Sequence, residues 1–204
     1  MVKKYVKVFK NYLILLFILV GLVGLVNTIV ALYNPWIEIW RIWVICISHT
    51  LFIIFLDAIF ATITHALPES WFEPTKRIYH VSKVEVSFLE AIGIKKWKGW
   101  VPETGEFAGF KKNHIYDASS QEYIHKFLVE TCYAEWVHYS MMIPSIIDLF
   151  MGPTSYIVPF FIWFGLINIF LNLLPSLIQR WVRPKMLRYY LHMTKNKNKD
   201  EVIA

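Results

Sequence analysis

The sequence predicts an all-α, polytopic membrane protein with about four transmembrane helices and a cytoplasmic or interfacial middle segment. Hydrophobic residues make up 56% of the 204-residue chain and charged residues only 18%, a composition too apolar for a soluble domain of this length. Long uncharged runs also alternate with basic segments, and about 20 apolar residues are enough to cross a bilayer as a helix. We therefore expect a single membrane domain over residues 1–204.

Four apolar segments are the predicted spans. The first lies in a run of 27 uncharged residues between Lys10 and Glu38, and the second is interrupted only by Asp57. The third is short and includes Asp148, whereas the fourth carries no charge. The expected spans are 12–33, 42–65, 136–151 and 154–179, with an interfacial segment at 69–135.

The first apolar run also has the features of a signal peptide, because Lys3 and Lys4 precede it. Its apolar stretch is longer than the roughly 7–15 residues usual for a signal, and no clear small-x-small cleavage site follows it. A retained anchor is therefore favoured over a cleaved signal.

Basic residues set the predicted orientation in the cell membrane. The middle segment from Glu69 to Glu135 holds nine Lys or Arg, whereas the short connections on the other side hold only Arg41. By the positive-inside rule, both termini and the middle segment face the cytoplasm. The formal charge of +6 then reflects topology and attraction to anionic lipid, and does not indicate nucleic-acid binding. Cys46 and Cys132 show no pairing or metal spacing, which fits a reducing compartment.

The middle segment has two interpretable stretches. Val81–Phe88 fits either a short strand or an amphipathic helix. Ser119-x-x-Glu122 is a capping-box pattern, so a helix is expected to begin near Ser120. Pro144 should kink that helix.

An ionisable pair falls on the apolar face of this helix. A step of about 100° per residue defines a stripe made of Ile124, Phe127, Leu128 and Thr131. Glu135 and His138 fall inside the stripe, where unpaired charge is costly. Their spacing of three residues allows a hydrogen bond in which the carboxylate orients the imidazole and raises its basicity. We therefore predict that His138 is a general base and Glu135 its partner.

Three other features each have a structural and a functional interpretation. The Lys95–Trp100 cluster suits an interfacial anchor or a wall of the substrate site. Asp57 is either a counter-charge for another helix or a functional acid. Arg180 and Arg183 are either a positive-inside clamp or ligands for a headgroup or coenzyme A phosphate.

No metal site is predicted. The pattern Glu-x-x-His occurs at Glu122–His125 and again at Glu135–His138, and paired motifs of this kind bind two metals in helix bundles. The two pairs are about 220° apart on one helix, so they cannot both face one centre.

Four motifs follow one another in the second half of the chain: Glu130-Thr131-x-x-Ala134-Glu135-x-x-His138, Ile143-Pro144, Gly152-Pro153, and Asn172-x-x-Pro175-x-x-x-Gln179-Arg180-x-x-Arg183-Pro184. In this order they resemble the CrtO-type family of glycosyl-4,4'-diaponeurosporenoate acyltransferases, which act late in staphyloxanthin synthesis. The match is dense from Glu130 to Leu187. It is thinner upstream, at Leu67-Pro68 and Lys96-Trp97-Lys98.

The resemblance implies transfer of a long-chain fatty acyl group to a sugar hydroxyl of a membrane glycolipid, such as a glycosylated carotenoid. A sugar hydroxyl needs a base in contact with it, which is the role predicted for His138. The oxyanion donor has three candidates, namely Asn172, Gln179 or a lysine of 95–98. No nucleophile motif is present, so direct attack is favoured. The residues expected to bind substrate are Glu130, Asn172, Gln179, Arg180, Arg183, Lys96, Trp97 and Lys98.

No cofactor is expected. The fatty acyl donor would be a co-substrate, with acyl-coenzyme A, acyl carrier protein and a phospholipid as the three alternatives. Two other functions stay open. A non-catalytic membrane scaffold would need no base, and a lipid-modifying metalloenzyme would bind metal.

Overall fold

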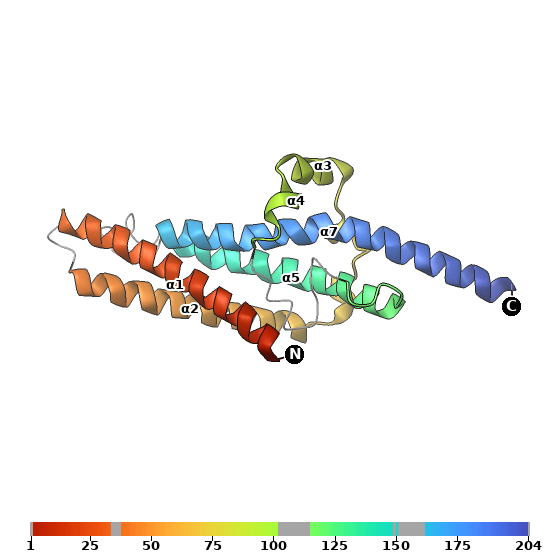
Figure 1. Cartoon of the computed structure of the whole chain (residues 1–204), viewed down its shortest axis with the longest axis horizontal. Helices are drawn as coiled ribbons and strands as arrows, with labels where there is room; N and C mark the ends of the chain where they lie inside the picture. The colour runs from red at the N-terminus through yellow and green to blue at the C-terminus, as the bar shows by residue number, and fades with distance from the viewer. Residues whose placement is uncertain (1, 34–37, 102–114, 149, 151–161, 204) are drawn as a thin grey trace. The chain divides into compact units, whose positions relative to one another are not determined.

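The computed structural model describes residues 2–33, 38–101, 115–148, 150 and 162–203, without the side chains of 2–13, 15, 16, 19, 148 and 197–203. These residues are helical and contain no strand, which confirms the all-α prediction for the described part of the chain. The elements in chain order (Figure 1) are α1 (Val2–Leu32), α2 (Ile39–Ala66), the short 3-10 helices η1 (Glu69–Phe72) and η2 (Arg77–Tyr79), α3 (Lys83–Ala91), α4 (Ile94–Trp97), α5 (Gln121–Asp148) and α7 (Ile162–Ile203).

Two of these helices, α2 and the Ile162–Asn196 part of α7, are long and apolar enough to cross a membrane. Only 6% of the most apolar stretch of α2 is buried, and 22% of that of α7. The core helix of a soluble protein would be mostly buried, so the low burial suggests membrane association.

The prediction of four spans is not confirmed. Among the described residues, α5 does not reach the apolarity of a span, because polar side chains continue along it to Asp148. The first predicted span includes side chains that the structure does not describe, and 154–161 and the Gly152-Pro153 motif lie outside the described residues. α5 continues as a helix through Pro144.

The chain divides into two compact units. Unit 1 contains Met1–Ile63 and Val137–Leu173, and unit 2 contains Thr64–Trp136 and Leu174–Ala204. Both α5 and α7 contribute residues to each unit. The single membrane domain expected over 1–204 stays a prediction.

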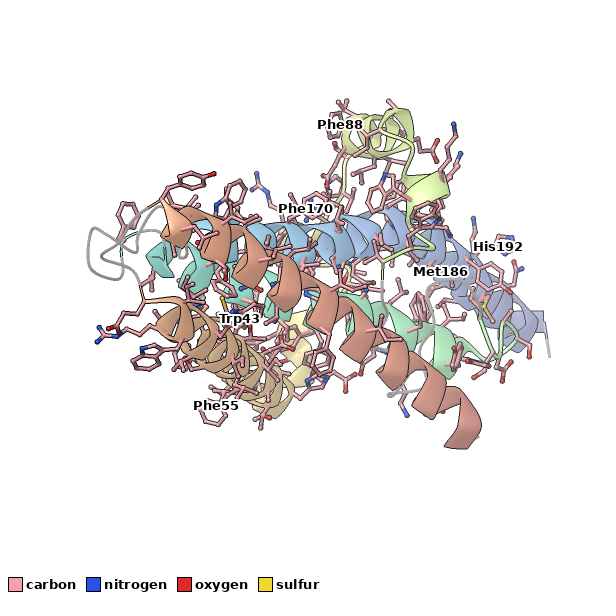
Figure 2. All side chains as sticks on the ribbon, turned by 60° about the vertical axis from the view of Figure 1, so that its left-hand side comes forward. Trp43, Phe55, Phe88, Phe170, Met186 and His192 are labelled. Carbon is pink, nitrogen blue, oxygen red and sulfur yellow. The ribbon has the colours of Figure 1, made fainter. Side chains whose placement is uncertain are left out.

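Unit 1 has a small core that α1 and α2 form together. Its buried members are Val23, Ala31, Ile42 and Cys46. A close approach at Gly24 of α1 makes this packing possible, because the ring of Trp43 from α2 occupies the space where a side chain would begin. Figure 2 labels Trp43 among the side chains of the molecule. A Cβ atom at position 24 would lie 2.6, 2.7 and 3.0 Å from three atoms of that ring.

Gly24→Ala should therefore destabilise the protein by about 1–3 kcal/mol, since the new methyl group would overlap the ring of Trp43 and force the ring out of its present position. Gly21→Ala is the matched control, because a Cβ at position 21 meets nothing within 4 Å. Thermal unfolding of the two variants in the same detergent measures the difference. Equal midpoints would show that Trp43 does not fill this space.

Unit 2 is built around a larger core. α3 and α4 lie beside α7 (Figure 1) and bury Leu89 and Ile94 against it. The remaining buried members of this core are Ile124, Phe127, Leu128, Ile178, Trp181, Val182 and Met186. Three of the residues predicted to form the apolar stripe of α5 therefore lie in the core, and Thr131 is also buried.

Local hydrogen bonds explain where the helices of unit 2 begin. Ser82 caps α3 by accepting a hydrogen bond from the backbone N–H of Glu85 at 3.1 Å, so the Val81–Phe88 stretch is mainly helical. Ser120 accepts a hydrogen bond from the backbone N–H of Tyr123 at 3.1 Å. The predicted start of α5 is therefore confirmed, with Ser120 as the capping residue in place of Ser119.

Candidate functional site

In each unit, a cluster of polar side chains joins α5 to α7. In unit 1 the cluster is a chain of hydrogen-bonded side chains, which we call the amide chain: His138, Asn172, Asn168 and Ser145. In unit 2 it is a group of two arginines and two glutamates, which we call the arginine–carboxylate cluster: Arg180, Arg183, Glu85 and Glu135. The predicted site residues are divided between the two clusters and the surface of unit 2.

The amide chain holds the imidazole of His138 through Asn172. Nδ1 of His138 lies 2.9 Å from Oδ1 of Asn172, which is buried. The amide nitrogen of Asn172 donates to the backbone carbonyl of Asn168 at 2.9 Å and to its side-chain oxygen at 3.0 Å. Asn172 is one turn of α7 beyond Asn168, so helix geometry brings the two amides together.

These contacts determine the tautomer of His138. A backbone carbonyl can only accept, so the atom of Asn172 that faces the Asn168 carbonyl must be its amide nitrogen. The oxygen of Asn172 then faces the imidazole, and it too can only accept. Nδ1 of His138 must therefore carry a proton, which leaves the lone pair of a neutral imidazole on Nε2. A neutral imidazole held through Nδ1–H is the form that a general base requires.

Asp57 of α2 interacts electrostatically with His138, and both residues belong to unit 1. Both interpretations of Asp57, a counter-charge for another helix and a functional acid, stay predictions. The interaction also has a chemical consequence. A negative charge near an imidazole favours the imidazolium that forms when the ring accepts a proton.

Glu135 lies at the centre of the arginine–carboxylate cluster and is only 3% exposed. Its Oε1 accepts a hydrogen bond from Nη1 of Arg180 at 2.7 Å, and its Oε2 lies 2.5 Å from Nη2 of Arg183. Arg180 also forms a two-point contact with Glu85, through Nε to Oε1 and through Nη2 to Oε2 at 2.9 Å. Two positive and two negative charges are therefore gathered with no net charge, which is the condition for burying them.

Arg183 is almost completely enclosed, with 1% of its side chain exposed. Its Nε donates to Oγ1 of Thr131 at 3.0 Å and its Nη2 to the backbone carbonyl of Thr131 at 2.9 Å, while Nη1 donates to the carbonyl of Tyr79 at 3.2 Å. Because its N–H groups point to these oxygens, the contact with Oε2 of Glu135 is an ion pair without a well-directed hydrogen bond. Through these hydrogen bonds, Arg183 connects α7 to α5 and to the η2 segment.

These partners change the role of Glu135. We expected its carboxylate to orient His138, but the contacts of the carboxylate are with two arginines, and Nδ1 of His138 is held by Asn172. Arg183 is buried, and Arg180 pairs with two carboxylates. The headgroup contacts expected of the two arginines stay a prediction.

The basic and aromatic cluster at 95–100 folds partly back onto unit 2. Trp97 packs on its core and donates from Nε1 to the carbonyl of Ile92 at 3.2 Å, and the ammonium of Lys98 lies 4.8 Å from the centre of the Trp181 ring. Lys96 and Trp100 are exposed. Part of the cluster therefore serves packing, and its exposed members suit the anchor that we expected.

The remaining predicted residues lie in unit 2. Glu130 faces His65, with Oε2 and Nε2 3.7 Å apart, and burial raises the pKa of this glutamate while the nearby histidine opposes the rise. Gln179 is half-buried on α7. Burial also raises the pKa of the Cys132 thiol to about 12, so this thiol stays protonated and is a poor nucleophile.

The side chains of both Glu-x-x-His pairs have other partners, which for Glu135 and His138 are described above. Nε2 of His125 faces Oε2 of Glu73 at 3.4 Å, and Glu122 pairs with Lys126. Within the described ranges, no three His, Cys, Asp or Glu side chains are grouped as metal ligands.

Asn168 and Ser145 are polar partners that we did not predict. The signal was present as Asn168-x-x-x-Asn172, because two amides four residues apart share one helix face. Unpaired amides are costly in an apolar run, so this spacing predicts a polar partner on a neighbouring helix.

Comparison with known proteins identifies the family to which this chain belongs. A family model described as glycosyl-4,4'-diaponeurosporenoate acyltransferase matches residues 68–192, more than half of the chain. No curated protein and no solved structure matches it. The matched region includes His138, Asn172 and the complete arginine–carboxylate cluster. The chain therefore belongs to the CrtO family of glycosyl-4,4'-diaponeurosporenoate acyltransferases.

Proposed function

We propose that this protein is a membrane acyltransferase that moves a long-chain fatty acyl group to a sugar hydroxyl of a glycolipid, with a glycosylated carotenoid acid as the acceptor. The observation that carries the proposal is the imidazole of His138, whose Nδ1–H is held by Asn172 so that Nε2 carries the lone pair. Family membership supports the acyltransferase class.

In the proposed reaction, Nε2 of His138 removes the proton of the sugar hydroxyl as its oxygen attacks the acyl carbonyl. A new ester C–O bond forms, and the bond between the acyl carbon and its thiol or alcohol leaving group breaks. The imidazolium then returns the proton to the leaving group. Asp57 in its ionised form would favour the imidazolium in the interval, and Asn172 holds its Nδ1–H throughout. The donor is a co-substrate, of which acyl-coenzyme A is one class, and no cofactor takes part.

Both substrates would be lipids with their reacting ends at the level of the headgroups. We propose that both termini and the segment at 69–135 face the cytoplasm, as the distribution of Lys and Arg indicates. A long acyl chain would lie along the apolar helices, where each buried methylene contributes about 0.8 kcal/mol.

The test is acyl transfer by the pure protein in bilayers. A palmitoyl donor should react much faster than an acetyl donor, because only the long chain gains burial energy that positions its carbonyl. The same sugar should be a far better acceptor on a lipid than free in solution. Product formation is followed by mass spectrometry for the four combinations. Equal rates for acetyl and palmitoyl donors on soluble glucose would exclude the lipid-substrate model, and no transfer to any glycolipid would favour a non-catalytic scaffold.

A further inference from the structure

The amide chain continues from Asn172 to Asn168 and Ser145. These two residues determine how the side-chain amide of Asn172 is oriented. The amide nitrogen of Asn168 lies 2.6 Å from Oγ of Ser145 and 3.4 Å from the backbone carbonyl of Met141. Oγ of Ser145 is 3.0 Å from the same carbonyl. Ser145 is fully buried, and Asn168 is partly buried. None of these contacts involves the residues assigned to catalysis.

Every donor in this chain can be assigned. The Met141 carbonyl only accepts, so the hydroxyl of Ser145 donates to it and its oxygen is left to accept from the Asn168 amide nitrogen. The side-chain oxygen of Asn168 therefore faces Asn172 and accepts from that amide nitrogen at 3.0 Å. The hydrogen bonds thus run in one direction, from Nδ1–H of His138 through two amides and a hydroxyl to a backbone carbonyl.

A reversed amide would break this order. If the Asn172 amide were turned over, its oxygen would face the backbone and side-chain oxygens of Asn168, and two hydrogen bonds would be replaced by contacts between acceptors. Its nitrogen would then face the imidazole and require an unprotonated Nδ1, which moves the proton to Nε2 and removes the base. The side chain of Asn168 therefore acts on the tautomer of His138 without touching it.

We propose that Asn168 is a positioning residue that keeps His138 in the Nδ1–H tautomer by fixing the amide of Asn172, with Ser145 as its anchor on α5. The effect on turnover rests on the function proposed for His138, but the effect on the tautomer does not. The backbone carbonyl at position 168 remains in any variant, so the side chain supplies one of the two acceptors of Asn172.

The test measures the tautomer directly. The full-length protein is labelled with ¹⁵N-histidine in lipid bilayers, and solid-state NMR reports which ring nitrogen of His138 is protonated, assigned by comparison with His138→Gln. Wild-type protein should show Nδ1–H. In Asn168→Leu the ratio of Nδ1–H to Nε2–H should fall about fivefold, the effect of losing one hydrogen bond of ordinary net strength. Because only the Nδ1–H tautomer has the lone pair on Nε2, the kcat for acyl transfer should fall in proportion to the measured fraction of Nδ1–H, with KM unchanged.

Asn27→Leu is the matched control. Asn27 is a buried asparagine of α1 that donates to the carbonyl of Val23 four residues earlier, outside the amide chain. Its replacement removes a buried amide that has no role in the tautomer of His138. The ratio of Nδ1–H to Nε2–H and the kcat should therefore both match the wild type. If Asn168→Leu fails to fold, Ser145→Ala takes its place and should shift the ratio in the same direction by a smaller factor.

A wild-type spectrum dominated by Nε2–H, or an unchanged ratio in the folded variant, would overturn the inference. A lower ratio would support the positioning of the tautomer by Asn168, and turnover that does not fall in proportion to the Nδ1–H fraction would refute His138 as the base. The two claims are therefore tested separately.

Discussion

His138→Gln should reduce kcat for acyl transfer by roughly 10²–10⁴-fold, the usual contribution of a general base. Glutamine is close to histidine in size, so it fills the same space beside Asn172. The lone pair that accepts the hydroxyl proton is lost. The rate is measured under saturating donor and acceptor in bilayers, with the unfolding midpoint as a check of folding.

The control for this variant is His192→Gln. His192 is exposed near the end of α7, 3.5 Å from Asn196, and has no contact with the amide chain among the described residues. Its replacement should leave kcat within about twofold of the wild type, as expected for a surface substitution. A His138→Gln protein that is folded and keeps activity within a few-fold of the wild type would end the assignment of His138 as the base.

Glu135→Gln should destabilise the protein by about 3–5 kcal/mol, the usual cost of removing one partner from a buried ion pair. Arg180 keeps its contact with Glu85, so the excess positive charge falls mainly on Arg183, which is buried and has no other carboxylate partner among the described residues. The glutamine amide fills the same space without neutralising that charge. Chemical unfolding in detergent measures the difference in the free energy of unfolding.

Glu122→Gln provides the comparison on the same helix. The side chain of Glu122 is 82% exposed and pairs with Lys126 one turn later. An exposed pair contributes little, so the free energy of unfolding should be unchanged. Equal losses in the two variants would mean that the arginine–carboxylate cluster does not stabilise unit 2. If the folded Glu135→Gln protein turns over at the normal rate, Glu135 takes no part in the chemistry.

The positions of residues on a single helix could be predicted from the sequence. The period of 3.6 residues placed Glu135 on the buried stripe of α5, and the serine-rich start predicted where that helix begins. The partners of Glu135 could not be found in the same way. A helical wheel relates residues one or two turns apart, whereas Arg180 is 45 residues away and Glu85 is 95 residues from Arg180.

The partner of His138 could not be found from helix periodicity either. Its spacing from Glu135 made that carboxylate the nearest candidate along the chain, but the imidazole is held by Asn172, 34 residues away. The family motif had already singled out Asn172, although as an oxyanion donor. The number of spans stays a prediction, because α5 pairs its polar side chains with α7, and a hydropathy profile does not reveal pairing of this kind.

The separation along the chain of the residues that pair in unit 2 also determines when their contacts can form during synthesis. Tyr79 and Arg183 are 104 residues apart, and Glu135 precedes Arg180 by 45. A ribosome adds roughly 5–20 residues per second, so Glu135 is made about 2–9 seconds before its first arginine. Its carboxylate must remain hydrated during that time, because an unpaired charge is too costly to bury. Within unit 2, α7 is thus translated after α3 and α5, to which its arginines bind. A nascent chain that ends before Arg180 contains Glu85 and Glu135 without the two arginines that neutralise them.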